Sequence, residues 1–160
     1  MTIASAGLTV DPAAETIDLG ALTVRFLVSS ENSSGTVAIF ELAVPAGQRL
    51  MAPAHSHNHY EETICGVEGV LTWTVDGNPI TVGPGQALCI PRGAVHRFDN
   101  TSATQDARAI CVITPAALGP EYFRGAREIV RAAAGGPPDR AKMTELMLRH
   151  GLTPAPPPQS

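Results

Sequence analysis

The feature that most constrains this chain is a succession of short apolar segments, each interrupted by glycine, proline or asparagine. These segments are rich in Val, Ile, Leu, Ala and Thr, and they cover residues 21–28, 36–44, 63–67, 70–75, 80–82, 87–90, 95–98 and 107–114. Residues 31–35 and 76–78 carry turn chemistry, because Gly and Asn tolerate positive φ. Many short strands of this kind predict an all-β barrel or sandwich over residues 1–115.

The pattern changes from strands to helices after Thr114. Residues 120–134 place apolar side chains at helical spacing before Gly135 and Gly136. Asp139 is positioned to cap a second helix, which Gly151 ends. We predict a helical extension over residues 116–151, lying over the barrel mouth as a lid or wall, and a proline-rich, disordered tail over residues 152–160.

Composition narrows the class of protein further. Hydrophobic residues make up 44% of the 160 residues, which is enough for one domain with a core. Charged residues are only 16%, which favours apolar surface buried between subunits and therefore a homodimer. A net charge of −4 without a basic run argues against nucleic-acid or membrane partners.

The cysteines and the N-terminus indicate the cellular compartment in which the protein works. Cys65, Cys89 and Cys111 are odd in number and far apart, so they are interpreted as reduced thiols that act as small buried hydrophobes. The first ten residues show no secretory signal, and every apolar run is too short to cross a bilayer. These observations predict a cytoplasmic protein.

The histidines are concentrated in one stretch. His55, His57 and His59 alternate, and Glu61 and Glu62 follow. On an extended chain, side chains two residues apart point the same way, so His55 and His57 would aim two imidazoles at one point. Imidazole with carboxylate suits Fe(II), Mn, Ni, Cu or Zn. A histidine pair at this spacing also occurs on ordinary surfaces and loops, so it does not by itself define a metal site.

Two longer motifs resemble the signature motifs of the cupin superfamily. From Gly85 the chain reads G-Q-A-L-C-I-P-R-G-A-V-H-R-F-D-N, with Pro91, Gly93, His96 and Asn100 at the family's positions. From His55 it reads H-S-H-N-H-Y-E-E-T-I-C-G-V-E-G, with His57, Glu62 and Gly69 at matching positions. The chain departs from the family upstream, where Gly47 lies further from His55 than the family's glycine does. The resemblance covers roughly residues 36–114.

The resemblance implies a double-stranded β-helix, or jelly-roll barrel, that holds one divalent transition metal. The family's ligands would fall on His55, His57, Glu62 and His96, with Fe(II) favoured and Mn, Ni, Cu or Zn as alternatives. The closest likeness within the family is to small quercetin-dioxygenase-like proteins. This implies oxygen-dependent cleavage of a small phenolic or enolic substrate, with Glu62 acting as a catalytic base.

Several alternatives stay open at this point. A metal-dependent isomerase, lyase or decarboxylase would use the same ligands without oxygen, and a non-catalytic binding protein would use the same pocket. The parity of a straight strand favours Glu61 as the ligand, whereas the motif favours Glu62. His59 is interpreted as a rim residue. Arg92 and Arg97 flank the second motif, where they are candidates for orienting an acidic substrate.

Overall fold

The computed structural model describes residues 14–157, which contain eleven strands and two helices. The strands are β1 (Thr16–Leu19), β2 (Leu22–Val28), β3 (Ala38–Val44), β4 (His55–His57), β5 (Glu61–Glu68), β6 (Leu71–Val75), β7 (Asn78–Val82), β8 (Ala87–Ile90), β9 (His96–Asp99), β10 (Ala107–Thr114) and β11 (Leu152–Pro154). The helices are α1 (Pro120–Ala132) and α2 (Arg140–Arg149).

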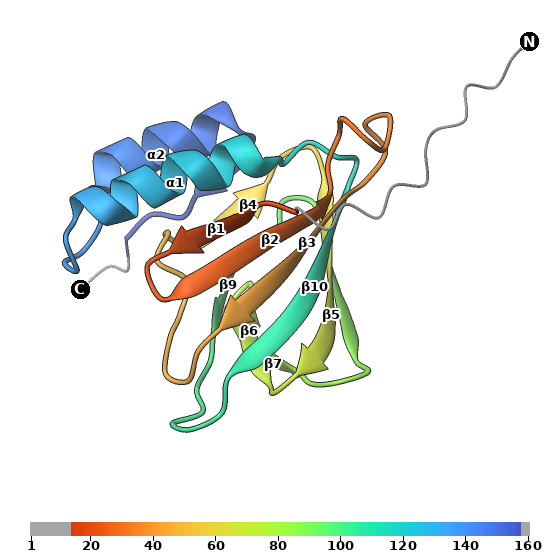
Figure 1. The fold of residues 1–160 in the computed structure, drawn as a ribbon, viewed down its shortest axis with the longest axis vertical. Coiled ribbons are helices and arrows are strands. Elements are labelled where there is room, and N and C mark those ends of the chain that lie inside the picture. Colours follow the sequence, from red (N-terminus) through yellow and green to blue (C-terminus); the bar gives the residue numbers. More distant parts are fainter. Residues whose placement is uncertain (1–13, 158–160) are drawn as a thin grey trace, which may run out of the picture.

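The strands form two antiparallel sheets that face each other around the core. One sheet has the order β1-β2-β3-β10-β5-β8 and the other has the order β11-β4-β9-β6-β7. Strands distant in sequence therefore lie side by side, as β3 and β10 do (Figure 1). This arrangement is a jelly-roll barrel with C-terminal helices, which confirms the predicted fold class.

Alternation of apolar residues explains why these strands bury one face. In β3 every second residue is buried, from Ala38 through Phe40 and Leu42 to Val44. Strand β10 alternates in the same way and pairs with both β3 and β5, which places Cys111 opposite Phe40 on one side. Because side chains of a strand point alternately to opposite faces, every second residue of these strands points into the barrel and helps to fill it.

Turn residues set the hairpins. Asp76 and Gly77 have φ angles of 46° and 81° and join β6 to β7 in a two-residue loop, as their identity predicts. Sequence reasoning missed β1, although Gly20, with φ of 69°, closes the β1–β2 hairpin. The signal was a glycine between two short apolar runs.

The two helices lie against one end of the barrel (Figure 1). Helix α1 is anchored by Phe123, whose ring centroid lies 5.5 Å from Phe26 and 5.1 Å from Phe40 on the sheet beneath it. Such aromatic contacts add to the burial of apolar area. Asp139 caps α2 by accepting a 3.1 Å hydrogen bond from the Lys142 amide, as predicted.

The prediction of a disordered tail is wrong for its first residues. Residues Leu152–Pro154 form β11, which pairs with β4 in register. Leu152 is buried, and the backbone of β11 satisfies the free edge of β4, which explains why this proline-rich stretch is ordered. The last three residues of the predicted tail, 158–160, lie outside the described part of the chain.

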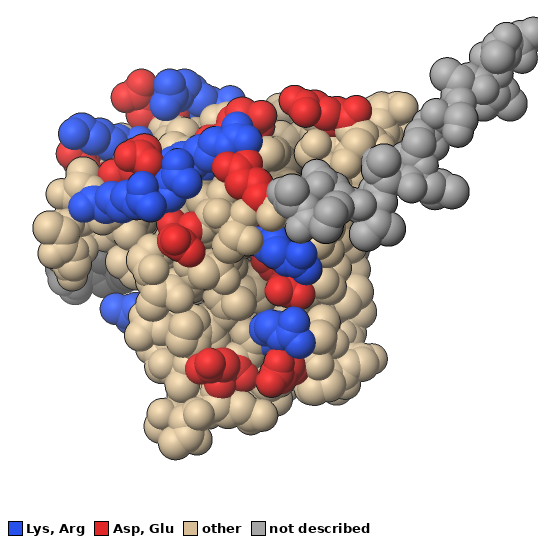
Figure 2. All heavy atoms as spheres, viewed as in Figure 1, with Lys and Arg blue, Asp and Glu red and all other residues tan. Residues whose placement is uncertain are grey.

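The visible surface carries mixed charge. Figure 2 shows basic and acidic side chains next to each other over the helices, where Arg131 pairs with Glu128 at 3.7 Å and Lys142 pairs with Asp139 at 3.9 Å. Neither α1 nor α2 is long and apolar enough to span a membrane.

The expectation of three buried cysteines holds for only one of them. Cys111 is buried, Cys65 is half-buried and Cys89 is exposed, and all three are free thiols. Cys89 is exposed because it lies on the outward face of β8, the edge strand of its sheet.

Candidate metal centre

Two neighbouring strands bring three histidines together inside the barrel. His55 on β4 lies directly opposite His96 on β9, and His57 follows two residues later on the same buried face. The ring centroids are 4.8 Å apart for His55 and His96 and 4.6 Å apart for His57 and His96. One ring nitrogen from each histidine lies within 4.8 Å of the others. The predicted convergence of these imidazoles is therefore present.

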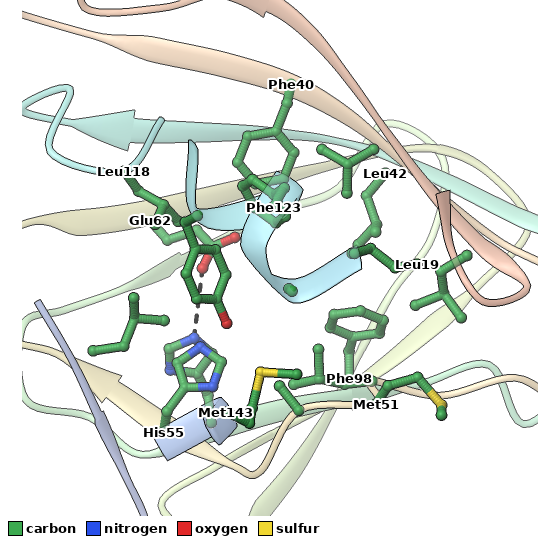
Figure 3. Close-up of a pocket in the computed structure, with 18 of the residues that line it drawn as sticks. Leu19, Phe40, Leu42, Met51, His55, Glu62, Phe98, Leu118, Phe123 and Met143 are labelled. Atoms are coloured by element: carbon green, nitrogen blue, oxygen red, sulfur yellow. Dashed lines mark ion pairs between the residues drawn. The ribbon is translucent and has the colours of Figure 1, made fainter. Parts of the chain in front are cut away.

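Glu62 reaches the cluster from β5 on the facing sheet (Figure 3). Its Oε2 lies 3.5 Å from Nε2 of His57 and 3.5 Å from Nε2 of His96. Glu61 is the first residue of β5 and is exposed, so its side chain lies away from the histidines. The turn over residues 58–60 breaks the parity argument that favoured Glu61. The structure places Glu62 beside the cluster, and its role as a ligand stays a prediction.

Backbone carbonyls orient two of the imidazoles. Nδ1 of His55 lies 2.9 Å from the Pro53 carbonyl, and Nδ1 of His96 lies 3.0 Å from the Ala94 carbonyl. Because a carbonyl only accepts, each Nδ1 carries a proton, so Nε2 is the ring nitrogen left to bind a metal when it carries no proton. This is the usual way in which proteins fix the tautomer of a metal-binding histidine.

His57 is held by stacking instead of by a hydrogen bond. Its ring stacks on Tyr60 at 4.5 Å and 26°, and the Tyr60 hydroxyl donates a 3.5 Å hydrogen bond to the His150 carbonyl. Nδ1 of His57 is buried and has no hydrogen-bond partner among residues 14–157. Burying an unpaired polar atom is unfavourable, so a bound group that interacts with this nitrogen would stabilise the site.

The site keeps two of its histidines neutral. Burial lowers the pKa of His55 to about 3, with a further contribution from nearby His96. Burial also lowers the pKa of His57 to about 4, against the charge of Glu62. Neutral imidazole is the form that binds a metal, so both side chains are ready to coordinate at neutral pH.

Glu62 and His96 shift each other's pKa through the hydrogen bond between them. Burial would raise the pKa of Glu62, but the hydrogen bond from His96 and the charges of the histidines lower that pKa to about 2. Burial would lower the pKa of His96, but the bond to Glu62 raises it. Three imidazoles and one ionised carboxylate match the ligands that divalent transition metals prefer, so the donor set fits the predicted cofactor.

An apolar cavity opens beside the cluster. Its volume is about 70 Å³, and one water needs roughly 10–15 Å³ on this measure, so the cavity has room for several waters or a small ligand. Its wall is mainly apolar and comes from both sheets, both helices and β11, and it includes Phe40, Leu42, Trp73, Phe98, Leu118, Tyr122, Phe123, Met143 and Leu152. Figure 3 shows several of these side chains surrounding the space in front of His55 and Glu62.

The helices do form part of the cavity wall, as predicted. Tyr122 and Phe123 come from α1 and Met143 comes from α2. Sequence reasoning identified these residues only as the apolar faces of helices, and it missed Leu152 entirely. Trp73 lines the cavity, and its indole nitrogen is buried without a hydrogen-bond partner in the described chain.

The other candidate residues of the two motifs and their flanks lie outside the histidine cluster. Asn100 is buried and donates 2.9 Å hydrogen bonds to the carbonyls of Val44 and Gln105, which fixes the chain just after β9. His59 is exposed, in keeping with a rim residue. Arg92 and Arg97 are exposed and do not line the cavity, so neither touches a molecule bound inside it.

A buried thiol lies behind the carboxylate. Cys111 is fully buried on β10, and burial raises the pKa of its thiol, with the charge of Glu62 adding to the effect. The thiol therefore stays protonated next to the carboxylate. In the sequence, Cys111 was recognisable only as an apolar position on a strand, and nothing indicated that it lies next to Glu62.

Comparison with known proteins gives one consistent family. The Cupin domain family matches residues 40–113. Over 100 residues the chain is 28% identical to quercetin 2,3-dioxygenase of Bacillus subtilis (strain 168), an alignment that covers 62% of this chain and 28% of that protein. The chain thus matches well under half of that relative's length.

Solved structures agree on the fold. KdgF from Halomonas sp. superimposes with a TM-score of 0.57 at 14% identity, covering 68% of this chain and 93% of that one. A sugar phosphate isomerase of the cupin superfamily from Silicibacter pomeroyi superimposes with a TM-score of 0.55 at 17% identity, covering 64% of this chain and 71% of that one. With the two motifs, the barrel and the histidine cluster in place, residues 40–113 of this chain form a cupin domain.

Proposed function

We propose that this protein is a metal-dependent enzyme with a dioxygenase-like activity on a small phenolic or enolic substrate. The observation that carries the proposal is the position of His55, His57, His96 and Glu62 at one side of a small apolar cavity. The partial likeness to quercetin 2,3-dioxygenase supports the same class of reaction. Fe(II) is the metal we favour, held by the three histidines and Glu62.

The metal would supply a Lewis acid that binds the oxygens of the substrate and, for Fe(II), a redox centre for O₂. The residues of this chain have separate tasks. Glu62 is ionised and lies beside the cavity, so it accepts the proton of a substrate hydroxyl. The apolar wall excludes water and packs against the ring or chain of the substrate.

The test begins with metal content and oxygen consumption. Protein purified without a metal-affinity tag is analysed for its metal and then supplied with catechols, flavonols and diketones in an oxygen electrode. Oxygen uptake with turnover supports the proposal. Turnover under argon replaces it with isomerase, lyase or decarboxylase chemistry, and tight binding without turnover replaces it with a non-catalytic binding protein.

A matched pair of variants connects the activity to the site. Glu62→Gln removes the proposed base and one proposed metal ligand, and we expect turnover per bound metal to fall about 100-fold or more, within the usual range for general-base catalysis. Glu61→Gln changes the neighbouring exposed carboxylate and serves as the control. Equal activity of the two variants would remove Glu62 from the mechanism.

A further inference from the structure

A second hollow, much larger than the apolar cavity, shares lining residues with that cavity. Its volume is about 740 Å³. It lies between residues 49–54, the end of β9, the start of α2 and residues 155–157. We call it the rim groove. Three arginines line it, namely Arg49, Arg97 and Arg140.

The rim groove has an excess of positive charge. Asp99 is the one acidic residue among those that line it, and it lies 3.8 Å from Nη1 of Arg97. Nη2 of Arg140 donates a 3.4 Å hydrogen bond to the Ala155 carbonyl, which places its guanidinium in the groove. Within residues 14–157, no carboxylate lies within 4.0 Å of Arg49 or Arg140. Three arginines and one aspartate therefore leave an excess of two positive charges among the residues that line the groove.

The rim groove and the metal cavity share a wall. The residues common to both linings are Leu50, Met51, Ala52, Phe98 and Met143. On β9, His96 belongs to the metal cluster, Arg97 lines the groove and Phe98 lines both spaces. Met51 is 38% exposed, so the part of this wall that it forms reaches the surface.

We propose that the rim groove binds the anionic end of the substrate, a carboxylate or a phosphate monoester, while the apolar part of the same molecule enters the metal cavity. The proposal rests on the proposed function for the cavity half. Guanidinium groups bind both kinds of anion through paired hydrogen bonds, which suits the arginines of the groove. The small volume of the cavity requires that any larger molecule extend outside it, and the groove is the adjoining space.

Binding is tested with three matched probes that share an aromatic body. These are 4-phenylbutyrate, 3-phenylpropyl phosphate and the uncharged 4-phenylbutyramide, titrated by calorimetry into the full chain with and without its metal. We expect at least one anion to bind about tenfold more tightly than the amide, since charge-assisted hydrogen bonds are worth more than neutral ones. The arm that gains identifies the carboxylate or the phosphate.

Variants assign the preference to the groove. Arg49→Gln with Arg140→Gln removes the two unneutralised charges, and we expect the preference for the anion to disappear. The control is Arg92→Gln with Arg149→Gln, which removes the same charge from exposed positions that line neither space. A control that loses the preference equally would overturn the proposal, because net charge would then explain the binding.

Metal removal separates this proposal from the proposed function. A carboxylate held by the groove keeps its advantage over the amide in metal-free protein. An advantage that vanishes with the metal and survives the groove variant would show that the anion binds the metal, which overturns the proposal. The anion preference does not depend on turnover, so it stands or falls apart from the activity assay.

Discussion

Two histidines of the cluster take their orientation from residues next to them in the chain. Pro53 and Ala94 each lie two residues before the histidine whose Nδ1 their carbonyl accepts, so short local turns fix both tautomers. His57 has no such carbonyl and depends on Tyr60 and on the opposite sheet. Neighbours in the chain therefore orient two of the histidines, and tertiary contacts orient the third.

Replacing His96 removes the histidine that connects the two motifs. We expect His96→Ala to lose nearly all bound metal, because the remaining two imidazoles come from a single short strand. Elemental analysis measures the loss, and circular dichroism reports whether the barrel stays folded. His59→Ala, at an exposed position, is the control. Undiminished occupancy in His96→Ala would contradict the ligand assignment.

Gly69 tests a close backbone approach. Its φ is +62°, and an added Cβ would meet the Asp106 carbonyl and the backbone of Ala107. We expect Gly69→Ala to cost about 2 kcal/mol or more in the free energy of unfolding, from both strain and contact. Gly77 has φ of +81° with open space around it, so Gly77→Ala should cost about 1 kcal/mol. Urea titration distinguishes them, and equal losses would contradict the role of the contact.

At the scale of elements, the strand that carries His55 and His57 is completed by the C-terminal segment. Strand β4 has only three residues, and it lies between β9 and β11. Leu152 pairs with His57 and also lines the cavity. The helical extension therefore does more than cover the barrel, because it leads the chain back to the metal strand.

Truncating Leu152 should weaken this arrangement. We expect Leu152→Ala to lower the free energy of unfolding by about 2–5 kcal/mol, the usual range for a buried leucine, and to lower metal affinity through β4. Leu148→Ala removes a leucine that is 56% exposed on α2, and it should cost less than about 0.5 kcal/mol. Urea titration and metal titration measure both effects. Unchanged metal affinity in Leu152→Ala would show that β4 holds its position without β11.

The same pairing changes how the predicted lid is tested. Deleting residues 137–160 removes β11 together with α2, so it unpairs β4 as well as opening the cavity. Such a deletion therefore cannot separate the effect of losing the lid from the effect of disturbing the metal site. A substitution of Phe123 or Met143 probes the cavity wall with β11 in place.

At the scale of the whole molecule, the metal site makes stability depend on pH. The folded-state pKa values of His55, His57 and Glu62 are all below their ordinary values. The unfolded chain therefore binds more protons than the folded chain below about pH 6.5, and acid favours unfolding. The raised pKa of His96 acts in the opposite direction, so its contribution is present below pH 6.5 and is lost as pH rises through its folded pKa.

We expect the urea midpoint of metal-free protein to fall as the pH is lowered from 6.5 to about 4, because the unfolded chain protonates His55 and His57 at a higher pH than the folded chain does. Glu62 adds to the loss as the pH falls from 4.5 towards 2. Metal-saturated protein is the comparison, and its midpoint should fall more steeply because protons displace the ion from its ligands. A midpoint that does not change between pH 7 and pH 4 would contradict the burial of neutral histidines.

The assembly of the molecule stays a prediction. Low charge content favours a homodimer, as do the two strands β1 and β8 that end one sheet within residues 14–157. Light scattering should therefore give a mass of about twice 16.7 kDa. A mass of a single chain would remove the homodimer.

The sequence alone determined the strands with clear alternation, the turn at Asp76 and Gly77, and the histidine spacing. These features depend on neighbours along the chain, because alternation and turn conformation are local properties. The sequence alone did not reveal β1 and β11, which are short strands held by pairing with β2 and β4. A short segment has too few residues for a periodic pattern.

Only the tertiary structure decided which side chains meet across the barrel. Glu62 faces the histidines and Glu61 does not, because the turn after His57 resets the direction of β5. The rim groove likewise brings Arg49, Arg97 and Arg140 together from three separate parts of the chain. Distances across a barrel depend on sheet order and on the return of distant segments, which the pattern of a single chain does not encode.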